Sequence, residues 1–167
     1  MNKIIELRNI LFAILALGNS WPCLAIETKP YLTLDMAKRI ADVCEAKAAA
    51  EGWRKISIAI YDDGGNLKLF RRQDSAVMHS IQVSQLKGGT SAGFPRSTRA
   101  LGEIAFSNPE RPHGIEQVSG FAVFPGGLPI IAEDGTQIGG VGVSGATGDQ
   151  DESCAQAGLD AITELLK

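Results

Sequence analysis

The stretch GGVGVSGATGDQD, from Gly139 to Asp151, constrains the fold most, because its glycines fit two different kinds of protein. From Gly140 it reads G-V-G-V-S-G, a formal match to the G-x-G-x-x-G fingerprint of dinucleotide-binding proteins. That fingerprint requires a helix, then a second parallel strand ending in an acidic residue about 20 residues further on. Only 22 residues follow Gly145, and their pattern is that of one terminal helix. Chain length therefore excludes a dinucleotide-binding unit here.

The same glycines have a better explanation within a strand. Glycine inside a strand marks a bulge or a close approach by another backbone or by a ligand. We expect Gly140 and Gly142 to belong to a glycine-lined edge of an antiparallel sheet, against which a flat ligand lies. The alternative is purely structural, namely close packing of a helix on the strand.

Local patterns elsewhere predict an α+β chain with two hairpins. Turn signals at Asp62-Asp63-Gly64-Gly65 and at Asp134-Gly135 join pairs of strands. Thr33 and Ser97 are expected N-caps of helices, since their hydroxyls can accept from free backbone N–H groups. The expected helices cover residues 33–52, 75–93, 97–106 and 149–167, and the expected strands cover residues 56–61, 67–71, 120–124, 127–134 and 136–145.

The N-terminal segment has the composition of a secretory signal peptide. Lys3 and Arg8 precede the apolar run ILFAILALG, and a small residue, Ala25, follows. The run is too short to span a bilayer, which takes roughly 20 residues. We predict a signal peptide over residues 1–25 and a single domain over residues 26–167, with the mature protein periplasmic or secreted.

Charge and cysteine content limit the partners of the mature chain. Cleavage changes the formal net charge from −3 to −4, because Lys3, Arg8 and Glu6 leave. A mildly acidic domain without a basic run has no electrostatic footprint for nucleic acid or anionic lipid. Cys44 and Cys154 remain, and either a disulfide or two buried free thiols is compatible with their positions.

Several pieces occur in a fixed order: an alanine-rich helix, IAIYDDGGNLKLFRRQDSA, LKGGTSAG, GGLPI and DGTQIGGVGVSGATGDQDESCAQAGLDAI. This order and wording resemble the GlcG/HbpS family, also called PduO C-terminal-like, from Leu34 to about Leu166. The resemblance implies a profilin-like (GlcG-like) fold, with a central antiparallel sheet of about five strands and helices packed against it. It also implies homo-oligomers and, in some members, binding of haem or a related tetrapyrrole.

The iron ligand must be chosen from chemistry, because many members have no histidine at the position of His79. Haem iron is commonly held by histidine, with methionine as another option. His79 begins a helix beside Met78, whereas His113 lies in the polar loop NPERPHG. We therefore expect His79 to be the metal ligand if a histidine of this chain coordinates iron. Lys87 and Arg72 are the cations expected near the haem carboxylates.

The chain lacks the C-x-x-C-H motif of covalent haem attachment, a G-x-S-x-G elbow and an H-E-x-x-H zinc motif. The expected function is thus non-covalent haem binding, in sensing or storage, near His79, Lys87 and the glycine edge. An enzymatic role is the less favoured expectation. The open alternative is a small-molecule sensor or an accessory enzyme of hydroxy-acid (glycolate-type) metabolism.

Overall fold

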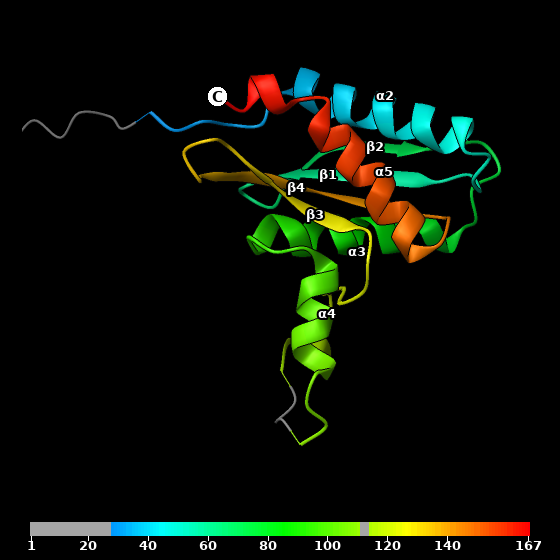
Figure 1. Ribbon diagram of the computed structural model, residues 1–167, viewed down its shortest axis with the longest axis vertical. Helices are drawn as coiled ribbons and strands as arrows, with labels where there is room; N and C mark the ends of the chain where they lie inside the picture. The colour runs from blue at the N-terminus through cyan, green and yellow to red at the C-terminus, as the bar shows by residue number, and fades with distance from the viewer. Residues whose placement is uncertain (1–27, 111–113) are drawn as a thin grey trace, which may run out of the picture.

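Four antiparallel strands in the order β2-β1-β4-β3 form the centre of the protein in a computed structural model that describes residues 28–110 and 114–167 (Figure 1). The predicted signal peptide and His113 lie outside the described residues. The strands are β1 (Ser57–Asp62), β2 (Leu67–Arg72), β3 (Gly127–Ile131) and β4 (Gln137–Ser144). The α+β class and both predicted hairpins are confirmed.

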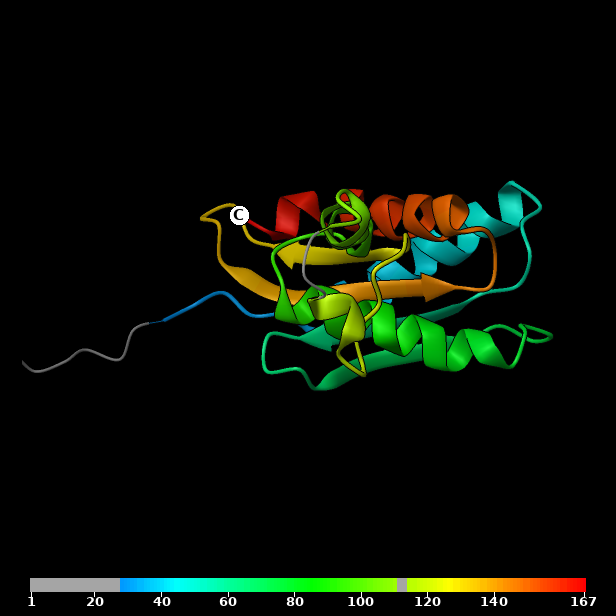
Figure 2. The same cartoon turned by 90° about the horizontal axis from the view of Figure 1, so that it is seen from below.

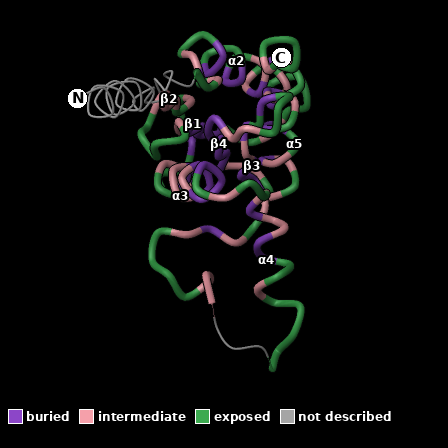
Figure 3. The backbone as a smooth tube through the Cα atoms, turned by 90° about the vertical axis from the view of Figure 1, so that its left-hand side faces the viewer, coloured by how far each residue is buried: buried purple, intermediate pink, exposed green. Residues whose placement is uncertain are grey.

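Helices cover both faces of the sheet (Figure 2). Two helices that pack against each other lie on one face, and a third helix lies on the other face. A fourth projects away from the sheet (Figure 3). In chain order the helical elements are α2 (Leu34–Ala50), α3 (His79–Gly93), α4 (Thr98–Phe106), η1 (Ile115–Gln117), α5 (Gly148–Asp160) and η2 (Thr163–Leu165). The pair on one face is α2 and α5, α3 covers the other face, and α4 projects.

The predicted caps are confirmed. The Thr33 hydroxyl accepts from the backbone nitrogen of Met36 at 3.1 Å, and Ser97 accepts from that of Ala100 at 3.1 Å. An additional capping box at Thr147 begins α5. These hydroxyls satisfy N–H groups that the first turn of a helix leaves without partners. The starts of α2, α4 and α5 are therefore determined locally, whereas α3 begins at His79, four residues later than expected, without a side-chain cap.

The expected strand at Gly120–Phe124 is absent, so the sheet has four strands and not about five. Side chains take the place of a ladder partner there. The Thr90 hydroxyl accepts from the backbone nitrogen of Ala122 at 2.9 Å, and the Thr98 hydroxyl donates to the carbonyl of Phe124 at 2.6 Å. Because these bonds satisfy its backbone, the segment runs beside α3 and α4 without joining the sheet.

Cys44 and Cys154 form a disulfide, which resolves the alternative left open by the sequence. The bond joins α2 to α5, and both residues are fully buried in the core between these helices and the sheet. The cross-link closes a loop over a sequence separation of 110 residues. A cross-link of this length removes much of the conformational freedom of the unfolded chain.

Replacing both cysteines with alanine is expected to lower the free energy of unfolding by about 2–5 kcal/mol. Urea denaturation of the variant, compared with the oxidised wild type, measures the loss. Adding a reductant should lower the midpoint of the wild type and leave that of the variant in place. Equal midpoints for wild type and variant under oxidising conditions would contradict a stabilising bond.

Candidate functional site

Gly140 and Gly142 lie in β4, an inner strand, and the backbone of α3 packs directly on them. A Cβ atom added at Gly142 would lie 2.2 Å from the nitrogen of Gly88 and 2.2 Å from the carbonyl oxygen of Ser84. One added at Gly140 would lie 2.3 Å from the nitrogen of Ala92. The prediction of a glycine-lined edge for a flat ligand is therefore wrong, because α3 occupies that face. Close helix packing, the alternative, is what the structure has.

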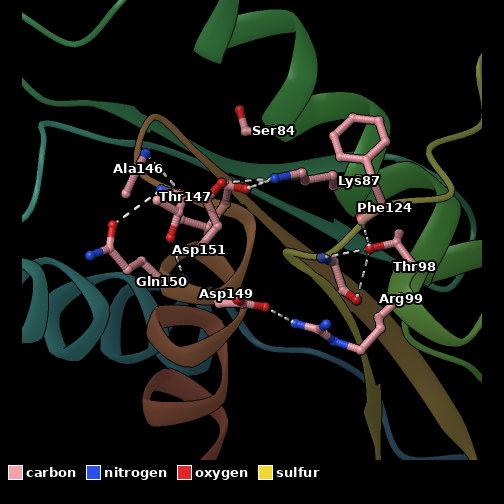
Figure 4. Close-up of polar contacts among 12 residues, drawn as sticks. Ser84, Lys87, Thr98, Arg99, Phe124, Ala146, Thr147, Asp149, Gln150 and Asp151 are labelled. Carbon is pink, nitrogen blue, oxygen red and sulfur yellow. Dashed lines mark hydrogen bonds and ion pairs between the residues drawn. The ribbon is translucent and has the colours of Figure 1, made fainter. Parts of the chain in front are cut away.

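Lys87 is buried beneath α3 in an ion pair with Asp151 at the start of α5 (Figure 4). Its Nζ donates to Asp151 Oδ2 at 2.9 Å and to the carbonyl of Val143 at 2.8 Å. Lys87 is 1% and Asp151 2% exposed. Asp151 Oδ1 also accepts from the nitrogen of Ala146 at 3.1 Å. The expected role of Lys87 as a partner for a haem carboxylate is wrong, since the amine is enclosed and already paired.

Burial dominates the electrostatics of this pair. It lowers the pKa of Lys87 and raises the pKa of Asp151, and the attraction between the two charges opposes both shifts. The ring of Phe124 lies 5.2 Å from Lys87 Nζ, close enough for a cation–π contact (Figure 4). The pair connects α3, β4 and α5, so it holds helices on opposite faces of the sheet together. Asp151 was not predicted as a site residue, because an acidic residue in the first turn of a helix is already explained by its favourable interaction with the helix dipole.

A second, more exposed set of charges lies beside the buried pair. Arg99 Nε donates to Glu152 at 2.7 Å, and the guanidinium also pairs with Asp149 (Figure 4). Arg99 lies in the first turn of α4, and both carboxylates belong to α5. These contacts attach the base of the projecting helix to the body of the protein.

His79, the expected metal ligand, is exposed at the first residue of α3. Val77 and Met78 immediately before it are 49% and 69% exposed. Within the described part of the chain, the His79 side chain has no hydrogen bond or ion pair. The helix start also lacks a side-chain cap. The structure thus places an accessible imidazole and an accessible thioether next to each other.

Arg72 lies at the same end of α3. Its guanidinium donates to the carbonyl of Ala76 at 2.7 Å, three residues before His79. Arg72 pairs with Ser57 across the β1–β2 ladder, and the Ser57 hydroxyl is hydrogen-bonded to that of Ser80 at 2.8 Å. Arg72 is therefore bonded to the segment that leads into His79, while Lys87 lies two turns further along α3 and is buried.

Among residues 28–110 and 114–167, no group of three or more His, Cys, Asp or Glu side chains is arranged to hold a metal ion. In the same residues, no helix is long and apolar enough to cross a membrane. A surface depression of about 550 Å³ lies at the start of α2, lined by residues that include Asp35, Arg39 and Leu165. None of the predicted site residues lines it.

Comparison with known proteins assigns the chain to one family. The family described as haem degrading protein HbpS-like matches residues 32–160, and the chain belongs to it. The uncharacterised 15.0 kDa protein of the dhaT-dhaS intergenic region of Citrobacter freundii is 35% identical over 136 residues, which are 80% of this chain and 94% of that protein. Protein GlcG of Escherichia coli is 35% identical over 125 residues, covering 71% and 85% of the two chains.

Two solved structures share the fold. The crystal structure of HbpS aligns with a TM-score of 0.73 and 29% identity, over 83% of this chain and 94% of the other. The crystal structure of a PduOC–heme complex aligns with a TM-score of 0.72 and 24% identity, over 80% and 96%. At 24% identity, the similarity to the PduOC–heme complex shows a shared fold and nothing more. The predicted family is thus confirmed.

Proposed function

We propose that this protein binds haem non-covalently at the start of α3, with His79 as the iron ligand. The observation that carries the proposal is the exposed Val77-Met78-His79 segment beside Arg72. Membership of a family described as haem degrading and HbpS-like supports haem as the ligand.

The residues at this end of α3 fit the chemistry of haem. Neutral imidazole and thioether are common axial ligands of haem iron, and both are offered here by neighbouring residues. The apolar surfaces of Val77 and Met78 suit contact with the macrocycle, since burying apolar area is favourable. Arg72 supplies a charge for a propionate carboxylate. When bound, haem supplies an iron centre, and the role of this chain is to bind and orient it.

The His79→Ala variant is expected to shift or abolish the Soret band of the haem complex, because the imidazole ligand is lost. Titration with haemin, followed by visible absorption, measures the band position and the affinity. His113→Ala is the matched control, since that histidine belongs to the polar sequence NPERPHG and its loss should leave the spectrum nearly unchanged. A spectrum unaltered by His79→Ala would contradict His79 and leave Met78 as the ligand to test.

We also propose that the protein is exported and works in the periplasm or outside the cell, starting near Ile26. The disulfide between Cys44 and Cys154 supports an oxidising compartment, where such bonds persist. Mass spectrometry of the protein recovered from the periplasm or medium gives the start residue and the oxidation state. A full-length, reduced chain in the cytoplasm would overturn this proposal.

Assembly into homo-oligomers is a further part of the proposal. Phe106 ends the projecting α4 and Val118 follows η1, and both are exposed within the described residues. Helix α4 itself extends away from the sheet (Figure 3). Exposed apolar side chains on a projection favour contact with another copy. Sedimentation velocity measures the assembly, and the mass of a single chain would contradict it.

A further inference from the structure

Among the residues that the structure describes, no helix packs along the α3-side face of the edge strand β2. On this side of the sheet α3 packs against β4, β1 and β3, and β2 lies beyond it (Figure 3). Phe70 pairs with Ala59 and Arg72 pairs with Ser57 across the ladder. Because cross-strand partners share a face and Ser57 is bonded to α3, Phe70 and Arg72 lie on the α3 side.

A β-bulge places two more residues on this side. Leu67 pairs with Tyr61 while Leu69 pairs with Ile60, so Lys68 is the extra residue of the bulge. The ring of Tyr61 is on the α3 side, since it lies 3.1 Å from where a Cβ of Gly88 would be. Leu67 is exposed, and Lys68 and Phe70 are half-buried.

The cations on the two faces of β2 differ in their partners. Arg71 points to the α2 side and pairs there with Asp42 and with Glu45, the latter at 3.1 Å. On the α3 side, neither Lys68 nor Arg72 has a carboxylate partner in the described part of the chain. The uncovered face therefore carries two unneutralised charges on either side of an aromatic ring.

The flank of α3 continues this surface. Met78, Ile81 and Gln85 are spaced as i, i+3 and i+7, so they lie along one line of the helix. The same line continues to Gly88, which packs beside Tyr61 and on the backbone of Ala59 and Gly142, so it lies over β1 and β4, next to β2. Met78, at the exposed end of this line, also belongs to the Val77-Met78-His79 segment proposed to bind the haem iron.

We infer that this surface, the β2 platform (Leu67, Lys68, Phe70, Arg72, Met78 and Ile81), holds the tetrapyrrole ring itself. The inference rests on the proposed function and adds where the macrocycle lies. Leu67 and Phe70 contact the ring, and Lys68 and Arg72 bind its two propionate carboxylates. A second copy of this chain is a poor occupant, because a two-fold contact would bring the same cations of both copies together.

Metal-free protoporphyrin IX tests the β2 platform independently of iron ligation. Its binding to the oxidised protein can be followed by porphyrin fluorescence. Phe70→Ala should weaken binding at least tenfold, since aromatic stacking is lost. Lys68→Gln combined with Arg72→Gln should do the same, while His79→Ala should leave porphyrin affinity within about twofold. Matched controls are Tyr31→Ala, at an exposed aromatic residue before α2, and Lys38→Gln on α2, which should both bind like the wild type.

Protoporphyrin dimethyl ester separates the two kinds of contact. Because it has no carboxylates, it should bind wild type and the Lys68/Arg72 variant equally but lose affinity in Phe70→Ala. Wild-type affinity of porphyrin in both platform variants, with haem still bound by the wild type, would overturn the platform and leave haem binding intact. Failure of the wild type to bind haem at all would overturn the proposed function. Thermal unfolding of each variant shows whether it is folded. Lys68→Gln alone, at a half-buried bulge, is a milder variant and should lower porphyrin affinity about threefold.

Discussion

Replacing Gly142 with alanine is expected to lower the free energy of unfolding by more than about 4 kcal/mol, the range reached only by severe core defects. The new Cβ would lie 2.2 Å from backbone atoms of α3, and backbone cannot move aside as a flexible side chain can. The helix must therefore shift away from β4, which opens the tightly packed layer beneath it. Urea denaturation of the purified variant, or its failure to fold, measures the effect.

Gly89→Ala is the matched control for this prediction. Gly89 lies in the same helix, but no atom lies within 4 Å of an added Cβ. Alanine favours a helix interior over glycine by up to about 1 kcal/mol, so this variant should be as stable as the wild type or more stable. A Gly142→Ala protein within about 1 kcal/mol of the wild type would show that α3 does not depend on direct contact with the strand.

The second large effect is expected for Lys87→Met, which should cost about 3–5 kcal/mol at neutral pH. The substitution keeps much of the buried volume but leaves the Asp151 carboxylate without its partner in an apolar setting. Lys38→Met is the control, because Lys38 forms only an exposed pair with Asp35 and should change stability by less than about 1 kcal/mol. Adding Asp151→Leu to Lys87→Met should recover part of the loss, since an apolar pair replaces the unpaired charge.

The loss in Lys87→Met should also depend on pH. Burial already raises the pKa of Asp151 in the folded wild type, and removing the neighbouring cation raises it further. A carboxyl whose folded pKa lies above its unfolded value contributes stability below the unfolded value, and this is lost as the pH rises through the folded pKa. The difference from the wild type should therefore be smaller near pH 4 than near pH 7. A difference that grows on acidification would contradict this account of the pair.

Local signals were sufficient to predict most of the fold. Thr33 and Ser97 begin helices because their caps involve residues three positions away, and the two hairpins follow from glycines in their turns. The strand expected at Gly120–Phe124 failed for a different reason. Its backbone is satisfied by hydroxyls of Thr90 and Thr98, which are distant in sequence. No pattern within the segment reports such partners.

The site was less predictable, because its geometry is tertiary. Lys87 and Asp151 are 64 positions apart, and nothing in either local sequence shows that they meet. The glycines of β4 are compatible with a ligand or with a helix, and only the position of α3 decides between them. In contrast, the position of His79 at the start of a helix could be predicted, because it follows from local sequence, and its role as a ligand stays a prediction. The position of Arg72 beside the segment before His79 could not be predicted locally, because it depends on how β2 pairs with β1.

The most direct test of the account is a haemin titration of the oxidised chain starting at Ile26, followed by visible absorption. We expect a shifted Soret band that saturates at one haem per chain, reverses on removal of haem and shows no covalent attachment by mass spectrometry. A spectrum that remains that of free haemin at every protein concentration would contradict haem binding by this protein.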